Sequence, residues 1–492
     1  MHISPGPTAA TRPARTAFLS RRAMRIAAAL GGALIVSDCK TFSPDGGLDV
    51  VSGIAGSELN KEVVLLRSEE EESAARDAVR RLLKRPVTAE SAVQIALFNN
   101  RGLQAAYNEL GISEAVMIAA HLPPNPTFSV ERLASSAEIE IEGRIIGNIL
   151  ALLTLPARAQ LAEDRFRQAQ LRAAEETLRV AADTRRAYYR AVAARETASF
   201  LTQSKSAAET ATQIAKRLGE TGAMSKLDQA REQVFYAEIT ARLASQQQRS
   251  ASERERLTRL LGLWGRDADF KLPGSLPPLP GRVQSLPTVE VEAVRRRLDL
   301  QTARIEVDAL AKSYGLTNAT RFLNLLEVAG IAGRTKEKET GERDKSRGFE
   351  VEFQIPLFDF GEVRVRQAEQ TYMQAVNRLA EKAVNVRSEA RDAYRTFRSA
   401  YDIARHYRNE VLPLRKIISD ETLLRYNAMQ IDVFDLLVEA RQRMNANIAA
   451  IDAQRDFWLA STDLMGAVVG GGGGRSGGET QPMAAAENGG GH

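Results

Sequence analysis

Two short segments of the chain carry polar side chains at the same spacing, each at the start of a long run of helix-forming residues. Ser225 precedes Asp228 by three residues, and Asp432 precedes Asp435 by three residues. At a helix start, the first side chain of such a pair can accept a hydrogen bond from a free backbone N–H, and the later carboxylate favours the positive helix end. The spacing therefore predicts two helix caps.

Residues that support enzymatic chemistry are scarce in the sequence. The four histidines, His2, His121, His406 and His492, are scattered, and none pairs with another at metal-ligand spacing. A single cysteine, Cys39, excludes an internal disulfide and a cysteine-based zinc site, and the sequence has no glycine loop of the kind that cradles phosphate. We therefore expect a protein that is not an enzyme and that holds no cofactor or metal.

The charge composition argues against nucleic-acid binding. Charged residues make up 26% of the chain, aromatic residues make up 6%, and 67 basic against 62 acidic residues leave a net charge of only +5. The charges are mostly interspersed, and no basic stripe with interleaved aromatic residues occurs. This pattern is typical of the solvated faces of long helices.

The elements that position the two polar pairs occur twice in the chain. Three residues match three others at an offset of 207: Gly222, Ser225 and Asp228 with Met429, Asp432 and Asp435. Two more match at an offset of 204: Leu261 and Gly262 with Met465 and Gly466. Because each match has the same place relative to long helical segments, the sequence indicates an internal duplication.

Those helical segments are unusually long. Glycine and proline are absent from 157–218, 223–261, 362–412 and 414–465. At 1.5 Å per residue, a helix of about 50 residues would span about 75 Å, several times the width of an ordinary domain. Such rods need neighbouring helices that bury their apolar stripe, and the seven-residue spacing of Leu437, Met444, Ile451 and Trp458 is typical of a coiled coil.

The amino terminus has the pattern of an export signal. Five arginines lie between Arg12 and Arg25, and the apolar stretch 26–36 that follows is too short to span a bilayer. Cys39 comes directly afterwards, as in bacterial lipoproteins whose cysteine is acylated. Asp38 is unusual before such a cysteine, where the residue is normally small and uncharged. Acylation of Cys39 and ordinary peptidase cleavage nearby both remain open.

After the signal, we expect a peripheral segment and then a longer helix. The charge order from Glu69 to Arg81 favours a short helix in the peripheral segment. Thr88 predicts the cap of a helix that runs through Leu103 and ends before Pro123.

In two regions, apolar residues recur at every second position, which is the period of a β-strand. Residues 127–155 have the alternation of a strand hairpin, and the second half repeats it as a strand at 322–331, a polar loop at 333–348 and a strand at 349–355. One apolar face and one carboxylate-rich face fit a half-buried sheet in a soluble protein, and they also fit the strands of a membrane barrel. Four strands cannot close a barrel, so the membrane interpretation requires several chains to pool their strands.

Over about 87–470, the sequence resembles the outer membrane factor proteins, the TolC-like exit ducts of bacterial efflux pumps and type I secretion systems. The residues that carry the resemblance are, in chain order, Ala96, Leu97, Asn99, Asn100 and Leu103, the pair Pro123 and Pro124, the run Pro-Leu-Phe-Asp-Phe-Gly at 356–361, the run Val-Leu-Pro at 411–413, and Tyr426, Asp435, Leu436 and Leu437.

The resemblance implies a mainly helical fold with strands, built as a duplicated repeat of helix, strand hairpin and helix. Three chains would form a twelve-stranded β-barrel in the bacterial outer membrane, continued by a long periplasmic α-helical barrel. The expected partners are two further copies of the chain, a periplasmic adaptor (membrane fusion) protein, an inner membrane transporter and outer membrane lipid. Substrates would pass without chemistry, and drugs, metal ions and proteins all remain candidates.

The resemblance also places a gate at the tips 219–228 and 426–435. Asp435 matches a carboxylate that rings the periplasmic constriction, where three like charges favour cations. Asp228 matches a position that holds the gate shut, with Tyr426 as one partner. Gln430 stands where well-studied members have an arginine, which implies a hydrogen-bonded latch rather than a salt bridge.

Tip residues are also the expected contacts of the adaptor. The candidates are Gly222, Ser225, Met429 and Asp432.

We expect six segments along the chain. These are a signal peptide at 1–38, a peripheral segment at 39–86, a first efflux repeat at 87–264, a linker at 265–287, a second efflux repeat at 288–469 and a disordered glycine-rich tail at 470–492. The alternative is a periplasmic, lipid-anchored coiled-coil scaffold or adaptor without a pore. An adaptor would have one helical hairpin flanked by small β domains, so the duplication favours the duct.

Overall fold

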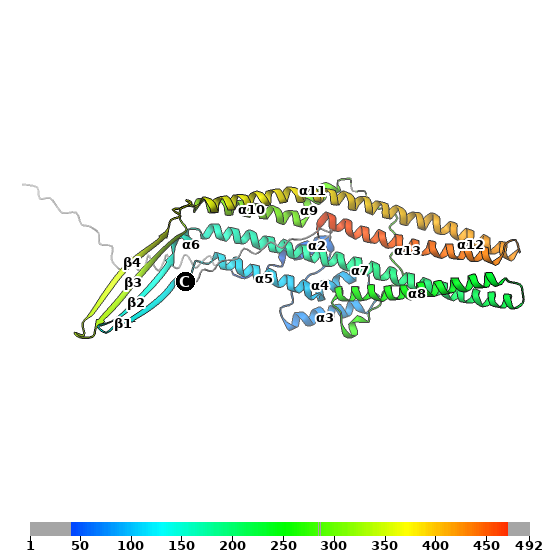
Figure 1. Ribbon diagram of the computed structural model, residues 1–492, viewed down its shortest axis with the longest axis horizontal. Coiled ribbons are helices and arrows are strands. Elements are labelled where there is room, and N and C mark those ends of the chain that lie inside the picture. Colours follow the sequence, from blue (N-terminus) through cyan, green and yellow to red (C-terminus); the bar gives the residue numbers. More distant parts are fainter. Residues whose placement is uncertain (1–40, 284, 286, 471–492) are drawn as a thin grey trace, which may run out of the picture.

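The protein is an elongated rod with a sheet at one end and two helical tips at the other (Figure 1). This computed structural model describes residues 41–283, 285 and 287–470. The expected signal peptide, Cys39 and all of the expected tail except Gly470 lie outside these residues.

The helix and strand layout occurs twice. The first part comprises α2 (Asp49–Leu59), α3 (Glu69–Leu83), α4 (Ala89–Asn99), α5 (Arg101–His121), β1 (Thr127–Ala134), β2 (Glu138–Asn148), α6 (Ile149–Leu153), α7 (Leu155–Glu220) and α8 (Lys226–Leu261). The second part comprises the 3₁₀ helix η1 (Gly265–Ala268), α9 (Val289–Arg296), α10 (Leu298–Ala319), β3 (Leu325–Glu337), β4 (Arg343–Gln354), α11 (Glu362–His406), the π-helix η2 (Tyr407–Val411), α12 (Leu412–Asn427) and α13 (Val433–Val469). The predicted mainly helical fold with strand hairpins is confirmed.

The four strands form one antiparallel sheet in the order β1-β2-β3-β4. The central pair joins the two repeats, since Ile141 of β2 lies opposite Arg334 of β3. The outer strands, β1 and β4, each have a neighbour on one side only.

The polar loop predicted at 333–348 is wrong. Strand β3 continues to Glu337 and β4 begins at Arg343, so only a short turn separates them. The continuation is polar, with Thr335 opposite Asp344, and backbone pairing across the ladder does not require apolar side chains. The sequence pattern missed these strand ends because the alternation that predicts a strand depends on apolar residues, and the ends are polar.

The single helix predicted from Thr88 to Pro123 is also wrong. Thr88 does cap α4, but the backbone is extended at Asn100, where α4 ends and α5 begins. The side-chain amide of Asn99 donates to the carbonyl oxygen of Gly262 at 2.6 Å, and that of Asn100 donates to the carbonyl oxygen of Leu260 at 3.0 Å. The break therefore supplies partners for the last carbonyls of α8.

A core of aromatic side chains joins α7, α11 and α13 near the middle of the rod. Phe457 is fully buried, with ring centroids 5.6 Å from both Phe397 and Tyr401. Trp458 stacks on Tyr189 at 5.3 Å and donates its indole N–H to the carbonyl oxygen of Pro277 at 3.0 Å. The inter-repeat linker is thereby attached to helices of both repeats.

The described residues 41–86 are more closely packed than a peripheral segment, which was the prediction for 39–86. The predicted short helix exists as α3, and Ser68 closes its capping box with Glu71. The unpredicted helix α2 buries Val51 and Leu59 in the main core. Its short apolar face gave too weak a periodicity for prediction.

The long rod of α11 and α12 passes through Pro413 without a turn. A π-helical segment, 407–411, ends two residues before the proline, which occupies the first turn of α12. Proline is tolerated there because the first N–H groups of a helix have no partner within it. The chain reverses instead at 428–432, within the predicted tip.

Candidate functional site

The first tip is a tight turn between α7 and α8. Gly222 has φ +74, and the N–H of Ala223 donates to the carbonyl oxygen of Leu218 at 2.8 Å. Ser225 is the N-cap of α8, and its hydroxyl oxygen accepts from the Asp228 N–H at 3.2 Å. The predicted cap at this tip is confirmed.

The second tip repeats the same turn between α12 and α13. Met429 takes the place of Gly222 and also has a left-handed backbone, with φ +58, and the residue is 94% exposed. Asp432 is the N-cap of α13, and its carboxylate accepts from the Asp435 N–H at 3.0 Å. The predicted cap is confirmed here too, and the matching backbone supports the duplication.

The two tip carboxylates differ in their surroundings. Asp228 accepts from the Ser225 hydroxyl at 2.6 Å and from the Arg231 guanidinium at 3.1 Å, both on its own helix. Asp435 is exposed, and no side chain in the described part of the chain pairs with its carboxylate. Its charge is therefore uncompensated within one protomer.

The predicted latch residues do not meet within one chain. Asp228 contacts neither Tyr426 nor Gln430 in the described residues, since its partners are Ser225 and Arg231. Tyr426 is half-buried near the end of α12, and Gln430 is exposed in the turn that follows this helix. A latch between these positions would therefore have to join different protomers.

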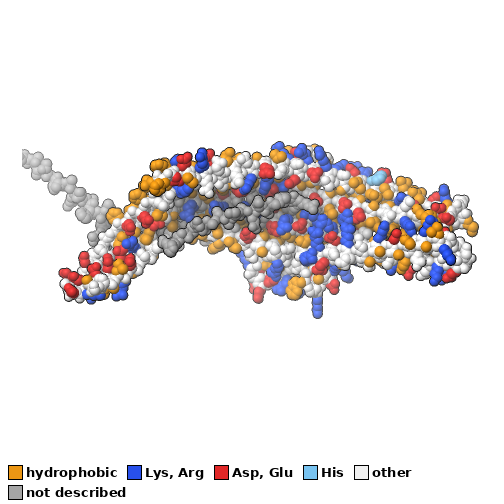
Figure 2. All heavy atoms as spheres, viewed as in Figure 1, with side chains coloured by type: hydrophobic (Ala, Val, Ile, Leu, Met, Phe, Trp, Pro, Cys, Tyr) orange, Lys and Arg blue, Asp and Glu red, His pale blue; other side chains and the backbone are white. Residues whose placement is uncertain are grey.

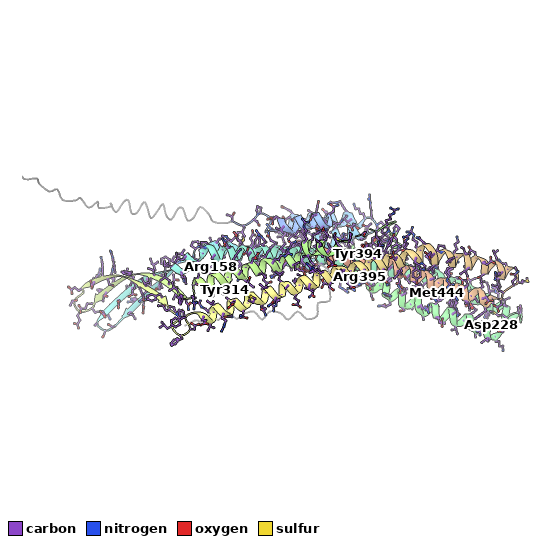
Figure 3. All side chains as sticks on the ribbon, turned by 90° about the horizontal axis from the view of Figure 1, so that it is seen from above. Arg158, Asp228, Tyr314, Tyr394, Arg395 and Met444 are labelled. Carbon is purple, nitrogen blue, oxygen red and sulfur yellow. The ribbon has the colours of Figure 1, made fainter. Side chains whose placement is uncertain are left out.

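The predicted adaptor contacts lie on the outer surface of the tips. Gly222, Ser225, Met429 and Asp432 are all exposed. Asp228 lies at the end of the rod opposite the sheet (Figure 3). The tips are thus the part of the molecule farthest from the strands.

Sequence analysis missed a set of contacts between the two helical hairpins, just inside the tips. The Arg231 guanidinium of α8 lies over the Phe434 ring of α13 at 4.8 Å, and the Arg441 guanidinium of α13 lies over the Phe235 ring of α8 at 4.2 Å. The offset of 207 would have pointed to the region, because it also relates the buried residues Glu232 and Glu439.

The sheet exposes large apolar side chains. Phe128, Val130, Phe349 and Val351 are all exposed, and Phe349 is 82% exposed. Hydrophobic side chains gather where the sheet meets the helices, and charged side chains gather at its free end (Figure 2). Exposed apolar side chains on strands are expected where strands face lipid.

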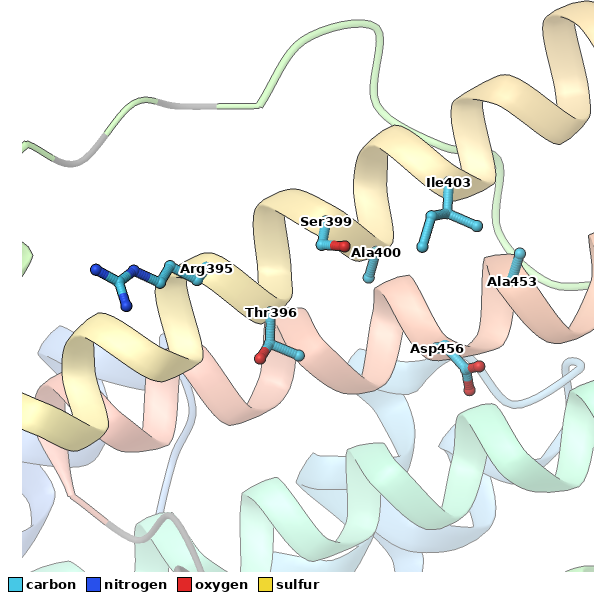
Figure 4. Close-up of a pocket in the computed structure, with 7 residues that line it drawn as sticks. All are labelled: Arg395, Thr396, Ser399, Ala400, Ile403, Ala453 and Asp456. Carbon is cyan, nitrogen blue, oxygen red and sulfur yellow. The ribbon is translucent and has the colours of Figure 1, made fainter.

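Grooves lie between the helices of the rod. One of about 410 Å³ is open and lies between α11 and α13, lined by Arg395, Thr396, Ser399, Ala400, Ile403, Ala453 and Asp456 (Figure 4). Among the described residues, no group of three histidine, cysteine or acidic side chains could hold a metal ion. No helix in the same part of the chain is long and apolar enough to cross a membrane.

Comparison with known proteins finds a family model that matches the second repeat. Residues 290–468 match the model of the family described as outer membrane efflux protein. The second repeat is therefore similar to that family. A search of curated proteins gives no significant match.

Solved structures extend the likeness to both repeats. The CmeC outer membrane channel of Campylobacter jejuni superposes with a TM-score of 0.64 at 16% identity, covering 78% of this chain and 86% of CmeC. The outer membrane protein VceC of Vibrio cholerae superposes with a TM-score of 0.63 at 13% identity, covering 78% of this chain and 96% of VceC. The MtrE outer membrane channel of Neisseria gonorrhoeae superposes with a TM-score of 0.62 at 17% identity, covering 80% of this chain and 89% of MtrE. At these identities the likeness establishes the TolC-like fold.

Proposed function

We propose that the protein is the outer membrane channel of a tripartite efflux or type I secretion system. It conducts substrates passively from a periplasmic adaptor and inner membrane transporter to the exterior, without catalysis. The observation that carries the proposal is the four-stranded sheet, which exposes an apolar face and leaves two strand edges unpaired at the end of a duplicated helical rod.

The open edges support a homotrimer. Backbone N–H and C=O groups at a strand edge cannot remain unpaired in lipid, so β1 of one protomer must pair with β4 of another. Three copies of four strands give a twelve-stranded barrel, and the helices then extend into the periplasm as a second barrel. The localisation is the outer membrane, with a periplasmic extension.

The two tips supply the gate and the docking surface of this channel. Asp435 of three protomers would form an acidic ring at the constriction, while Asp228, Tyr426 and Gln430 would contribute to contacts between protomers. The exposed positions Gly222, Ser225, Met429 and Asp432 would meet the adaptor.

The alternative function, a lipid-anchored scaffold or adaptor without a pore, accounts for less of the structure. It explains the helical hairpins but leaves the exposed apolar sheet and its two edges without a role. Drugs, metal ions and proteins all remain candidate substrates of the channel.

Purified protein reconstituted into planar bilayers tests the proposal. The detergent-extracted protein should give discrete ion-conducting channels. Protein that is extracted intact from the outer membrane but never conducts would contradict a pore and favour the scaffold.

Acylation of Cys39 gives a second expected result. Cells grown with labelled palmitate should produce labelled wild-type protein, and the Cys39→Ser variant should carry no label. An unlabelled wild-type protein whose mature amino terminus is another residue would instead establish ordinary peptidase cleavage.

A further inference from the structure

Arginines follow one line along α7 at intervals of seven residues. They are Arg158, Arg165, Arg172, Arg179 and Arg186, and together they form an arginine stripe. Seven residues are nearly two helical turns, so these side chains share one face of the helix and follow one another at steps of about 10.5 Å.

The two arginines of the stripe farthest from the sheet are neutralised by carboxylates. Arg179 pairs with Glu176 and, at 3.5 Å, with Asp183. Arg186 pairs with Asp183 at 2.9 Å and with Asp463 of α13 at 2.6 Å. This part of the stripe therefore carries little net charge.

The three arginines nearest the sheet differ from these two. Arg158 and Arg165 are exposed, as is Arg172, and none of them forms an ion pair with a carboxylate in the part of the chain that the structure describes. All three line a groove of about 820 Å³ between α5 and α7, and no acidic side chain lines that groove. Three positive charges thus lie along it without compensation.

The same groove also exposes hydrocarbon. Ile112 and Val116 of α5 line it and are 65% and 58% exposed, and the half-buried Leu161 and Phe166 of α7 line it too. A groove of this volume can hold a molecule of the size of a drug. Unpaired cations beside exposed hydrocarbon fit an organic anion that has an apolar body.

The contacts of α7 show which way the stripe points. The Gln170 side chain donates to the carbonyl oxygen of Gly47, just before α2, at 3.0 Å, and Asp164 pairs with a lysine of α10 at 2.5 Å. At about 100° per residue, Gln170 lies about 140° around the helix from Arg165, and Asp164 lies about 100° the other way. The stripe therefore points away from both α2 and α10.

Three protomers can enclose only the side of the helices to which the stripe points. Helices α2 and α4 pack on α7, and with this side turned inward they would occupy the duct in three copies. The stripe then lies on the inner wall of the duct. Arg158 lies toward the sheet and Asp228 lies at the opposite end of the rod, so the basic groove is far from the tips (Figure 3).

We propose that the groove along Arg158, Arg165 and Arg172 is a transit site for amphiphilic organic anions, which makes organic acids with an apolar body a substrate class of the duct. The inference rests on the proposed channel function. Guanidinium groups bind carboxylates and sulfonates through paired hydrogen bonds, and rings of arginine are a known means of attracting anions into a pore. Ile112 and Val116 would cover the apolar body.

Block of the ion current measures this binding. Naphthalene-1-sulfonate joins an apolar ring system to one anionic group. Added to the sheet side of wild-type channels in planar bilayers, it should reduce the current at a lower concentration than either inorganic sulfate or the cation 1-naphthylmethylammonium. Sulfate tests the charge alone, and the cation tests the apolar body alone.

Substitutions in the stripe assign the block to the groove. Arg165→Gln should raise the blocking concentration of naphthalene-1-sulfonate about two- to fivefold, as expected for one exposed ion pair, and the triple variant R158Q/R165Q/R172Q should raise it at least about tenfold. Arg179→Gln is the matched control. It removes an arginine of the same stripe that is already paired and lies outside the groove, so the blocking concentration should change less than about twofold.

The outcomes separate the inference from the function on which it rests. Wild-type protein that gives no channels would overturn the channel itself. Conducting channels that naphthalene-1-sulfonate blocks equally in the wild type and the triple variant would overturn the transit site alone, as would equal shifts in Arg165→Gln and Arg179→Gln. Loss of the heat-resistant oligomer in Arg165→Gln would assign the stripe to a contact between protomers and would also overturn the site.

Discussion

Replacing Asp435 with asparagine is expected to remove most of the cation preference of the channel. The Asp435 carboxylate is exposed and unpaired within the described part of one protomer, so three copies at a constriction would concentrate negative charge where ions pass. Two unit charges about 10 Å apart in water interact by roughly 0.4 kcal/mol, and the interaction grows where low-dielectric walls surround a narrow aperture. The cation-to-anion permeability ratio should therefore fall several-fold toward unity.

The reversal potential under a potassium chloride gradient measures this effect. Asparagine is the appropriate replacement because the Asp435 contact with the cap is made by its backbone N–H, which the substitution retains. Asp420→Asn is the control, since it removes an exposed carboxylate from α12 of the same hairpin, away from the tip turn. A reversal potential that is unchanged in Asp435→Asn would exclude this carboxylate from the constriction.

Replacing Gly361 with alanine is expected to prevent assembly of the channel. Gly361 ends the run 356–361, precedes α11 and has φ +72. A Cβ at this position would lie 2.2 Å from the carbonyl oxygen of Arg321 and 2.9 Å from its carbonyl carbon, so the backbone itself must shift. Because this junction aligns β4 with α11, the displacement should disturb the sheet edge that another protomer must pair with.

Gly341→Ala is the matched control for this substitution. Gly341 has the same φ of +72 in the turn between β3 and β4, but a Cβ there meets nothing within 4 Å. Both variants carry the strain of a left-handed backbone, on the order of 1 kcal/mol, and only Gly361→Ala adds the collision. The yield of heat-resistant oligomer from outer membranes should be near zero for Gly361→Ala and near wild type for Gly341→Ala. Equal yields would show that the junction tolerates a side chain.

Features that depend on local sequence were predictable. Ser225 and Asp432 cap helices because their oxygens reach an N–H three residues ahead, and the spacing alone encodes that contact. The start of β1 at Thr127 follows from the change of apolar period in the same way. The resemblance to a TolC-like duct supplied the joint arrangement of these elements, which is now supported by the fold.

Features that depend on distant partners were not predictable. The break at Asn100 exists because the end of α8, about 160 residues farther along the chain, needs donors for its carbonyls. The contact of the Arg441 guanidinium with the Phe235 ring likewise joins two separate helices, α13 and α8. The arginines and phenylalanines that meet here have no shared spacing, so a periodic pattern cannot reveal their contacts.

The mass of the detergent-extracted outer membrane protein tests the central claim most directly. Light scattering with correction for bound detergent should give three copies of the chain in one particle, and that particle should resist dissociation on heating in denaturing detergent. A trimer would agree with a barrel of pooled strands. A monomer that is soluble or that fractionates with the inner membrane would contradict the channel and return the scaffold to consideration.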